Sequence, residues 1–329
     1  MIIDEATVQG QVDKLAELRE AIGRVIVGQH AVVEQLLVGL LAGGHCLLEG
    51  VPGLGKTLLV RTLGSALALD FRRIQFTPDL MPSDIIGTEI LEEDHGTGRR
   101  HFLFQRGPVF THLLLADEVN RTPPKTQAAL LEAMQERTVS YAGTTHALPR
   151  PFFVLATQNP IEQAGTWPLP EAQLDRFLLQ VEVGYPDEAE ERAILVRTTG
   201  SEEAKVDAVM SGEDVLALQA LVRQVHVGDA LLDWITRLVR ATRPQGSALE
   251  EVREWVRWGA GPRAGQSLVL AAKARALLHG RLAATREDVH ALAAPVLRHR
   301  LLPTFAAEAA GRRADDVVAA LLRAMPAPA

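Results

Sequence analysis

Residues 50–57 read GVPGLGKT and directly follow the apolar run CLLE. Four of them, Gly50, Gly55, Lys56 and Thr57, match the spacing GxxxxGK(S/T). In this pattern the glycines let successive backbone N–H groups converge on phosphate oxygens, the lysine neutralises the β and γ phosphates, and the hydroxyl holds magnesium. The helix expected after the loop presents its positive end to the same anion. The sequence therefore predicts a phosphate loop made of Gly50, Val51, Pro52, Gly53, Leu54, Gly55, Lys56, Thr57 and Leu58.

Two adjacent acids follow a second apolar run. The stretch HLLLADE ends in Asp117 and Glu118. We expect Asp117 to orient the magnesium shell and Glu118 to polarise the attacking water, because phosphoryl transfer to water needs a positioned base more than covalent chemistry. The alternative is that the two acids only end a strand at the solvent. The phosphate loop favours the catalytic interpretation.

A third polar group ends the run VLATQNP. Asn159 is placed where a side-chain amide could hold the lytic water or the γ phosphate, and Pro160 then ends regular structure. Asparagine before proline is also common in turns, so this spacing alone leaves both interpretations open.

The elements that must position these residues are short apolar runs that alternate with helical or turn-rich segments. Such alternation indicates a mostly parallel sheet with helices on both faces. Helices are expected at 5–24, at 30–41 and after the phosphate loop, and a hairpin around AGTT is expected at 138–149. The five runs expected to form strands are 46–50, 72–77, 112–118, 151–159 and 176–184.

The character of the chain changes after Tyr185 and Pro186. The remaining residues are mainly alanine, leucine, arginine and glutamate at helical periods, and one of the helices is expected to begin after Thr285 as its N-cap. A chain of 329 residues also exceeds the usual size of one core. We therefore predict an α/β nucleotide-binding domain at 1–185 and a smaller, all-helical domain at 186–329.

Composition narrows the classes of partner. The net charge of -7 gives no general attraction to nucleic acid or anionic membrane. The single cysteine, Cys46, cannot form an internal disulfide and is expected to be a buried thiol in a reducing, cytoplasmic setting. No secretion signal or membrane-spanning segment is expected. The ten histidines lack a metal-ligand spacing, so we interpret them as structural or surface residues.

Taken together, these motifs resemble the MoxR family of AAA+ ATPases, within the clade that also holds magnesium chelatase motor subunits. The resemblance covers most of residues 25–265. It implies an αβα core with a five-stranded, mostly parallel sheet and a helical lid, with Walker A and Walker B motifs that bind ATP and Mg2+ for hydrolysis. The stretches that carry it are GVPGLGKT, QFTPDLMPSDIIG, LLLADEVNRTPPKTQAALLEAMQER, PFFVLATQNPIEQAGTWPLPEAQLDRF and GPRA.

The resemblance also implies roles that spacing alone does not give. Asn159 is similar to the first sensor of the family, and Arg263, in GPRA, to the second sensor, which reports the γ phosphate. Arg176, in LDRF, resembles the arginine finger that reaches into a neighbouring subunit. Ile26 and Val27, in VIVGQ, resemble the segment that packs against adenine. Without the resemblance, an arginine among helices is more often solvated or ion-paired.

Two inserts correspond to extra β-hairpins of this clade, at 87–106 and 138–149. In the first, Phe102, Phe104, Arg99 and Arg100 could form a gripping surface toward the ring axis or a partner. Alternatively the phenylalanines pack inward and the arginines are solvated. The sequence leaves both interpretations open.

The resemblance implies a homo-oligomeric, hexameric motor with a chaperone-like role in maturing other protein complexes, often enzymes with metal cofactors. A von Willebrand factor A domain partner would come from a separate chain. The first alternative is a magnesium chelatase-type motor subunit, and a nucleic-acid translocase is less favoured. A nucleotide switch that barely hydrolyses is disfavoured by Glu118 and Arg176, which matter for the transition state more than for affinity.

Overall fold

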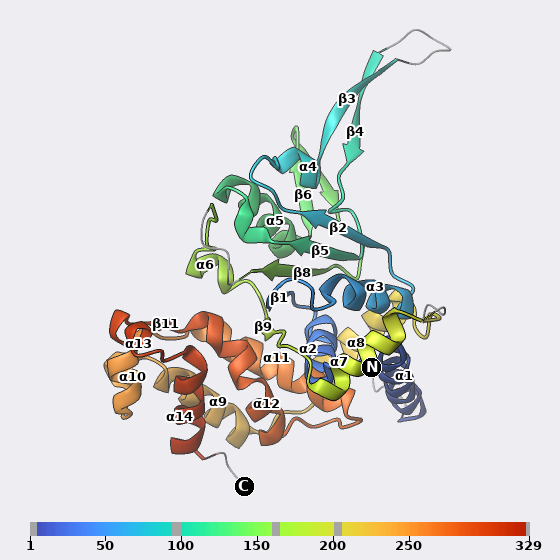
Figure 1. The fold of residues 1–329 in the computed structure, drawn as a ribbon. Coiled ribbons are helices and arrows are strands. Elements are labelled where there is room, and N and C mark those ends of the chain that lie inside the picture. The colour runs from blue at the N-terminus through green and yellow to red at the C-terminus, as the bar shows by residue number, and fades with distance from the viewer. Residues whose placement is uncertain (1–4, 94–99, 160–164, 201–205, 327–329) are drawn as a thin grey trace.

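The computed structural model describes residues 5–93, 100–159, 165–200 and 206–326 (Figure 1). Its centre is a five-stranded sheet in the order β2-β5-β8-β1-β9, and every pair of neighbours is parallel. The predicted five-stranded parallel sheet is confirmed. Because the strands run in one direction, all their carboxyl ends meet at one edge. The strands are β1 (Cys46–Glu49), β2 (Phe71–Gln75), β5 (Leu113–Asp117), β8 (Phe153–Gln158) and β9 (Leu179–Glu182).

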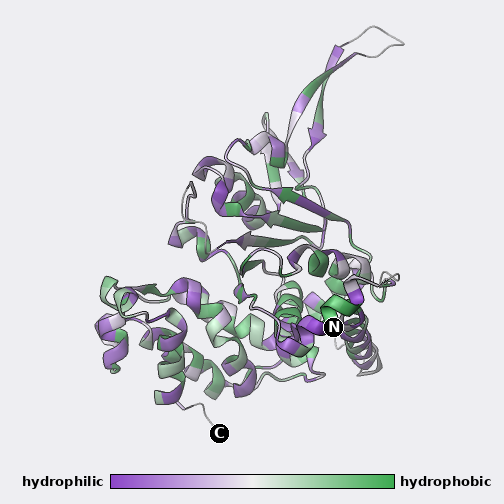
Figure 2. Ribbon diagram, viewed as in Figure 1, coloured by the Kyte–Doolittle hydropathy of each residue, from purple (hydrophilic) through white to green (hydrophobic). Residues whose placement is uncertain are grey.

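The sheet is covered on both faces, as its continuous apolar strands require. Alternate strand residues point to opposite faces, so Leu113 and Leu115 belong to one hydrophobic core, while Leu114 and Ala116 belong to the other. Helices α1 (Glu5–Val25), α2 (His30–Leu41) and α3 (Lys56–Ala66) contribute to the first core. Helices α4 (Pro82–Ile86) and α5 (Pro124–Glu136) contribute to the second. Figure 2 shows the central strands as mainly hydrophobic.

Both predicted hairpins are present as antiparallel pairs. Strands β3 (Gly87–Glu93) and β4 (Arg100–Arg106) form a long ribbon that projects away from the sheet (Figure 1). Strands β6 (Thr138–Tyr141) and β7 (Thr144–Ala147) form the shorter hairpin, whose turn places Ala142 and Gly143 at positive φ.

The carboxyl-terminal part is helical, as expected, and Thr285 does precede one of its helices. One feature was not predicted: β10 (Val256–Trp258) pairs with β11 (Leu302–Pro303), and these strands are too short to show an alternating pattern. The described residues also include the 3-10 turns η1 (Val119–Arg121), η2 (Pro244–Gly246) and η3 (Arg298–Arg300). The remaining helices are α6 (Glu171–Leu174), α7 (Glu188–Thr198), α8 (Gly212–Gln224), α9 (Asp229–Ala241), α10 (Glu250–Trp255), α11 (Pro262–Leu278), α12 (Arg286–Leu297), α13 (Phe305–Ala309) and α14 (Ala314–Ala324).

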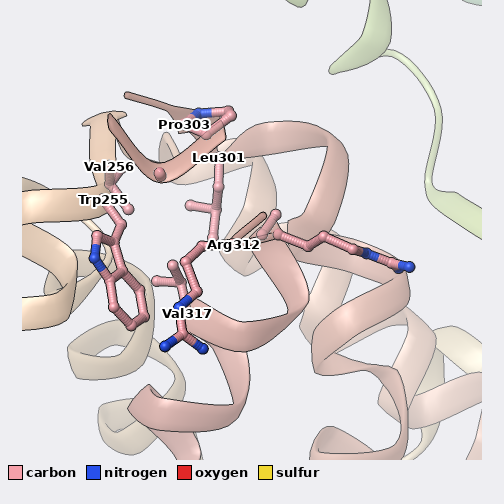
Figure 3. Close-up of a pocket in the computed structure, with 9 residues that line it drawn as sticks. Trp255, Val256, Leu301, Pro303, Arg312 and Val317 are labelled. Carbon is pink, nitrogen blue, oxygen red and sulfur yellow. The ribbon is translucent and has the colours of Figure 1, made fainter. Parts of the chain in front are cut away.

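A small cavity lies in the helical part beside Trp255 and Leu301 (Figure 3). The guanidinium of Arg312 sits 4.9 Å from the centre of the Trp255 ring. The cavity holds only about 10 Å³, enough for at most one water molecule, so it is no ligand site.

In the described ranges, none of the helices combines the length and apolar character that a bilayer crossing needs.

Candidate nucleotide-binding site

The predicted phosphate loop connects β1 to α3. Gly53 and Gly55 have φ of 87° and 72°, a conformation that residues with a Cβ rarely adopt, and Gly55 is the N-cap of α3. Lys56 begins the helix and its Nζ donates to the carbonyl oxygen of Gly50 at 2.6 Å. Burial lowers the pKa of Lys56, and the charges of Asp117 and Glu118 act in the opposite direction. The amine therefore lies over the loop and within the field of both acids.

Asp117 ends β5 and is held from both neighbouring strands. Its Oδ1 accepts from Thr157 Oγ1 of β8 at 2.6 Å, and its Oδ2 accepts from Arg73 Nη2 of β2, also at 2.6 Å. The side chain is 14% exposed. These contacts fix the carboxylate at the carboxyl edge of the sheet, where a metal bound to phosphate would lie.

Glu118 has a backbone conformation that is unusual for a residue with a side chain. Its φ is 59°, in the left-handed region, which costs on the order of 1–3 kcal/mol and is found most often at functional positions. Its N–H donates to Thr157 Oγ1 at 2.8 Å. Its Oε2 accepts from Gln75 Nε2 at 2.7 Å and lies 3.1 Å from Arg121 Nε. The turn thus aims the carboxylate along the edge of the sheet.

Sequence reasoning missed the residues that hold the two acids: Arg73, Gln75, Thr157 and Arg121. A signal for three of them was available in the strand alternation. Arg73 and Gln75 are two positions apart in β2, so they share one face, and Gln75 pairs in register with Asp117. Thr157 precedes Asn159 by the same interval.

Asn159 directly follows β8 and is buried, with 7% of its surface exposed. Because β8 lies between β1 and β5 in the sheet, Asn159 lies between the phosphate loop and the acidic pair. The three predicted motifs therefore meet at one edge of the sheet. This is where open parallel sheets bind their ligands.

The predicted adenine segment is tied to the phosphate loop. Gln29, the N-cap of α2, donates from Nε2 to the carbonyl oxygen of Leu54 at 3.2 Å. Ile26 is 7% exposed and packs in the core, whereas Val27 is half-buried. Beside Gly50 a cleft of about 470 Å³ opens, a size typical of small-ligand pockets. Its lining includes Val51, Val183, Tyr185, Arg298 and Arg313.

The two predicted arginines lie elsewhere. Arg176 follows α6 and precedes β9, and its side chain forms no hydrogen bond or ion pair with the described residues. Arg263, in the first turn of α11, contacts Asp175 at 3.4 Å between Nη1 and Oδ2. Leu178 donates to the carbonyl oxygen of His45, the residue before β1, so this segment lies at the amino edge of the sheet. Arg263 therefore contacts the residue that precedes Arg176, and this segment lies at the opposite edge of the sheet from the phosphate loop.

The donor set fits magnesium that is bound together with a nucleotide. Magnesium usually keeps several waters and takes one or two carboxylates plus substrate phosphates, rather than a full protein cage. Asp117 and the Thr57 hydroxyl are donors of this kind. Within the described ranges, no group of three or more histidine, cysteine, aspartate or glutamate side chains could hold a metal by itself.

Comparison with known proteins agrees with the fold. The ATPase family associated with various cellular activities (AAA) matches residues 45–179, and an AAA lid domain matches residues 250–321. Chaperone MoxR1 of Mycobacterium tuberculosis is 47% identical over 93% of this chain and 80% of its own length. Protein MoxR of Paracoccus denitrificans is 33% identical over 96% of this chain and 97% of its own length.

A solved structure also matches over the whole length. A protein from Cytophaga hutchinsonii, described as a candidate ATPase, has a TM-score of 0.91 and 41% identity, and the match covers 99% of this chain and 98% of that one. The parallel sheet, the phosphate loop and the helical lid together define an AAA+ ATPase, which binds and hydrolyses ATP. Within this class, the chain belongs to the MoxR family.

Proposed function

We propose that this protein is a ring-forming, magnesium-dependent AAA+ motor that remodels or matures other protein complexes. Two MoxR-named relatives support this, and one of them is named a chaperone. The observation that carries the proposal is the separation of two sets of residues. The phosphate loop and the acids share the carboxyl edge of the sheet, whereas Arg176 lies at the amino edge.

This separation supports an arginine that acts between subunits. Arg176 precedes the amino end of β9, while the phosphate loop follows the carboxyl end of β1, and the two strands are parallel. Each has four residues, which corresponds to about 13 Å of strand. We expect Arg176 to complete the site of a neighbouring copy, in a hexamer, and Arg263 to face the same neighbour through Asp175. A head-to-tail interface of this kind closes into a ring.

Within one site, each residue has a distinct task. The loop amides and Lys56 hold the β and γ phosphates, and Thr57 and Asp117 hold Mg2+, which neutralises charge on the phosphates when bound. Glu118 orients and polarises the attacking water, and Asn159 lies where its amide can hold that water or the γ phosphate. The backbone of Ile26 and Val27 is proposed to lie against adenine.

The β3–β4 hairpin is the proposed contact with a client or partner. Phe102 is 71% exposed and Leu91 is 55% exposed, as expected for a gripping surface. Phe104 instead stacks on His146 at 4.3 Å, and Arg100 pairs with Glu93 at 2.9 Å. Phe102 is thus exposed, as a contact surface requires, whereas Phe104 packs inward. Arg99 lies outside the described residues.

The partner expected for the family is a von Willebrand factor A domain protein, and the client is a protein complex, often a metal-cofactor enzyme. The lone cysteine, Cys46, is fully buried, which raises its thiol pKa and is consistent with a reducing cytoplasm.

A substrate trap tests this function. Glu118→Gln should bind ATP but stall before hydrolysis, so proteins held by the ATP state will stay bound. The variant is purified from cell extract with ATP or with ADP, and mass spectrometry identifies what remains. Retention of a von Willebrand factor A domain protein, or of a protein complex, with ATP alone is expected. Recovery of nucleic acid and its processing enzymes would replace the proposal with a translocase.

A further inference from the structure

A buried arginine of the lid contacts the segment that carries Arg176. Arg300 lies in η3 and its side chain is only 2% exposed. Burying a guanidinium is costly unless its hydrogen bonds are satisfied, and burial indeed lowers the pKa of Arg300 while Asp175 acts to raise it. Its partners within the lid are the carbonyl oxygen of Val296 and the hydroxyl of Ser267. All its other partners lie beside Arg176.

These other partners bracket Arg176 on both sides. Arg300 Nε donates to Asp175 Oδ1 at 2.8 Å, and Nη2 donates to the carbonyl oxygen of Phe177 at 2.7 Å. Weaker contacts of 3.4 and 3.3 Å reach the carbonyl oxygens of Asp175 and Leu178. His299 Nε2 also lies 3.2 Å from the carbonyl oxygen of Phe177. A planar guanidinium with several donors therefore fixes the backbone on which Arg176 is mounted.

We propose that Arg300 is a positioning residue for Arg176, through which the lid sets the direction in which Arg176 is presented to the neighbouring subunit. This inference rests on the proposed function, in which Arg176 acts between subunits. The same carboxylate of Asp175 receives Arg300 on Oδ1 and Arg263 on Oδ2. A lid movement that changes either contact changes the position of Arg176.

The test begins with Arg300→Lys, which keeps the charge but loses the fork of donors. Displacing a catalytic group by about 1 Å can cost about 100-fold in rate, so we expect a kcat loss of that order while ATP affinity is unchanged. Arg281→Lys is the matched control, because Arg281 is a lid arginine paired with buried Asp288. Among the described residues, Arg281 contacts Ala283, Thr285 and Asp288 and none of residues 175–178, so Arg281→Lys should keep full turnover.

A mixed-ring assay separates positioning from general damage. An Arg300→Lys subunit keeps its own Lys56 and Glu118, whereas a Glu118→Gln subunit keeps a correctly placed Arg176. When the two are co-expressed at equal levels, about a quarter of head-to-tail interfaces join an intact site to an intact arginine. Turnover should therefore rise well above that of either variant alone. A lid that damaged its own subunit's site would give no such recovery.

The outcomes distinguish this inference from the proposed function. Arg176→Ala mixed with Glu118→Gln must first recover turnover, and its failure would reject the arginine between subunits. If that pair recovers, unchanged turnover in Arg300→Lys, or no recovery on mixing, overturns the positioning role. Asp175→Asn serves as a second variant with nearly the same shape, and the same loss and recovery are expected if Arg300→Lys does not fold. Failure of Asp175→Asn to recover on mixing likewise rejects the inference.

Discussion

Glu118, the proposed base for the attacking water, also has an unusual backbone conformation, with a positive φ. Thr157 accepts from its backbone N–H, and Gln75 and Arg121 hold its carboxylate. Backbone strain of this kind persists only where the surroundings over-determine it. Here the surroundings are side chains from β2, β8 and η1, so three elements define one carboxylate.

Replacing Glu118 should therefore separate turnover from binding. Glu118→Gln keeps the size of the side chain but removes its basicity, so kcat should fall by about 100-fold to 10,000-fold with ATP affinity retained. Lys56→Ala should lose ATP affinity as well, because Lys56 neutralises phosphate in the ground state. Steady-state kinetics and nucleotide titrations measure both effects. Glu132→Gln, on the exposed side of α5, is the control. Unchanged turnover in Glu118→Gln would reject its role as base.

His45 gives the stability of the fold a dependence on pH. Its Nδ1 accepts from the Val154 N–H at 3.0 Å, and its Nε2 lies 3.1 Å from the carbonyl oxygen of Met134. The ring is therefore neutral, with the proton on Nε2, and a second proton on Nδ1 would face a donor. Burial, chiefly, lowers the pKa of His45 from 6.5 to about 4.

Acid destabilises the folded chain through His45, because the unfolded chain takes up a proton there more readily. Between pH 6.5 and about 4 the unfolded chain binds a proton at His45 that the folded chain excludes, so acidification lowers the free energy of unfolding. A shift of this size is worth about 3 kcal/mol across the window, and the contribution is complete above pH 6.5. Denaturant unfolding at several pH values should show a shallower slope for His45→Gln. Burial also lowers the pKa of His299, so His299 adds the same kind of acid destabilisation to the unmodified protein and to His45→Gln. Equal slopes would contradict the assignment.

At the residue scale, the sequence predicted those site residues that stand directly after an apolar run. The phosphate loop, the acidic pair and Asn159 each end an apolar run, and the parallel sheet places those ends together. Strand alternation places Arg73 on one face with Gln75 and Thr157 two residues before Asn159, but it does not show that Arg73 and Thr157 contact Asp117 on the neighbouring strand. Such a contact depends on strand order and register, which no local spacing specifies.

At the scale of elements, the β3–β4 hairpin combines a packed base with an apolar outer part. Phe104 packs near the base against β7, while Leu91 and Phe102 face each other further out and remain exposed. We expect Phe102→Ser in the Glu118→Gln background to reduce the proteins retained with ATP, and Phe102→Ser alone to leave basal turnover unchanged. Mass spectrometry of the retained proteins measures the first effect. An unchanged set of proteins would exclude this hairpin as the contact surface.

Helices α11 and α12 are joined by a buried carboxylate. Asp288 is fully buried, and burial alone would raise its pKa, but hydrogen bonds from Arg281, Thr285 and Arg275 hold the pKa below its ordinary value. Arg275 also donates to Glu34 of α2 at 2.7 Å. The Asp288 carboxylate also accepts from the backbone N–H of Thr285 at 2.9 Å, so Asp288 caps the amino end of its own helix, α12.

Removing this carboxylate should destabilise the lid strongly. Asp288→Ala leaves two arginines without their buried partner, and breaking such a pair typically costs about 3–5 kcal/mol. Urea unfolding followed by circular dichroism measures the loss. Glu287→Ala removes exposed contacts with the adjacent Arg286 and with Thr285, and its unfolding midpoint should stay close to that of the unmodified protein. A similar midpoint for Asp288→Ala would show that the network contributes little.

Element positions followed from the sequence where periodicity was long. The helix at 30–41 was predicted at its observed bounds, and the strand at 112–118 was only one residue too long at each end. The β10–β11 pair was not predicted because its strands have three and two residues. Such short strands are defined by the neighbours that packing brings beside them.

At the scale of the whole molecule, the nucleotide-binding part and the lid share one hydrophobic core. Leu36 and Leu48, from α2 and β1, belong to the same buried set as Leu218 and Leu277 of the lid. The lid is therefore packed against the sheet's own helices, and Arg300 extends this contact to the segment of Arg176. The domain boundary at 185 stays a prediction, since apolar packing is continuous across the two parts.

The separation of Arg176 from the phosphate loop predicts that ATP hydrolysis depends on assembly. An arginine finger is worth about three to five decades of rate, so an isolated subunit should be nearly inactive. Turnover per subunit should fall steeply as the protein is diluted through its assembly range, with mass photometry reporting the oligomer at each concentration. Arg176→Ala is the control, because its low turnover should not change with concentration even where rings form. Constant turnover per subunit down to a monomeric sample would mean that one chain contains a complete site, and the arginine between subunits would then be wrong.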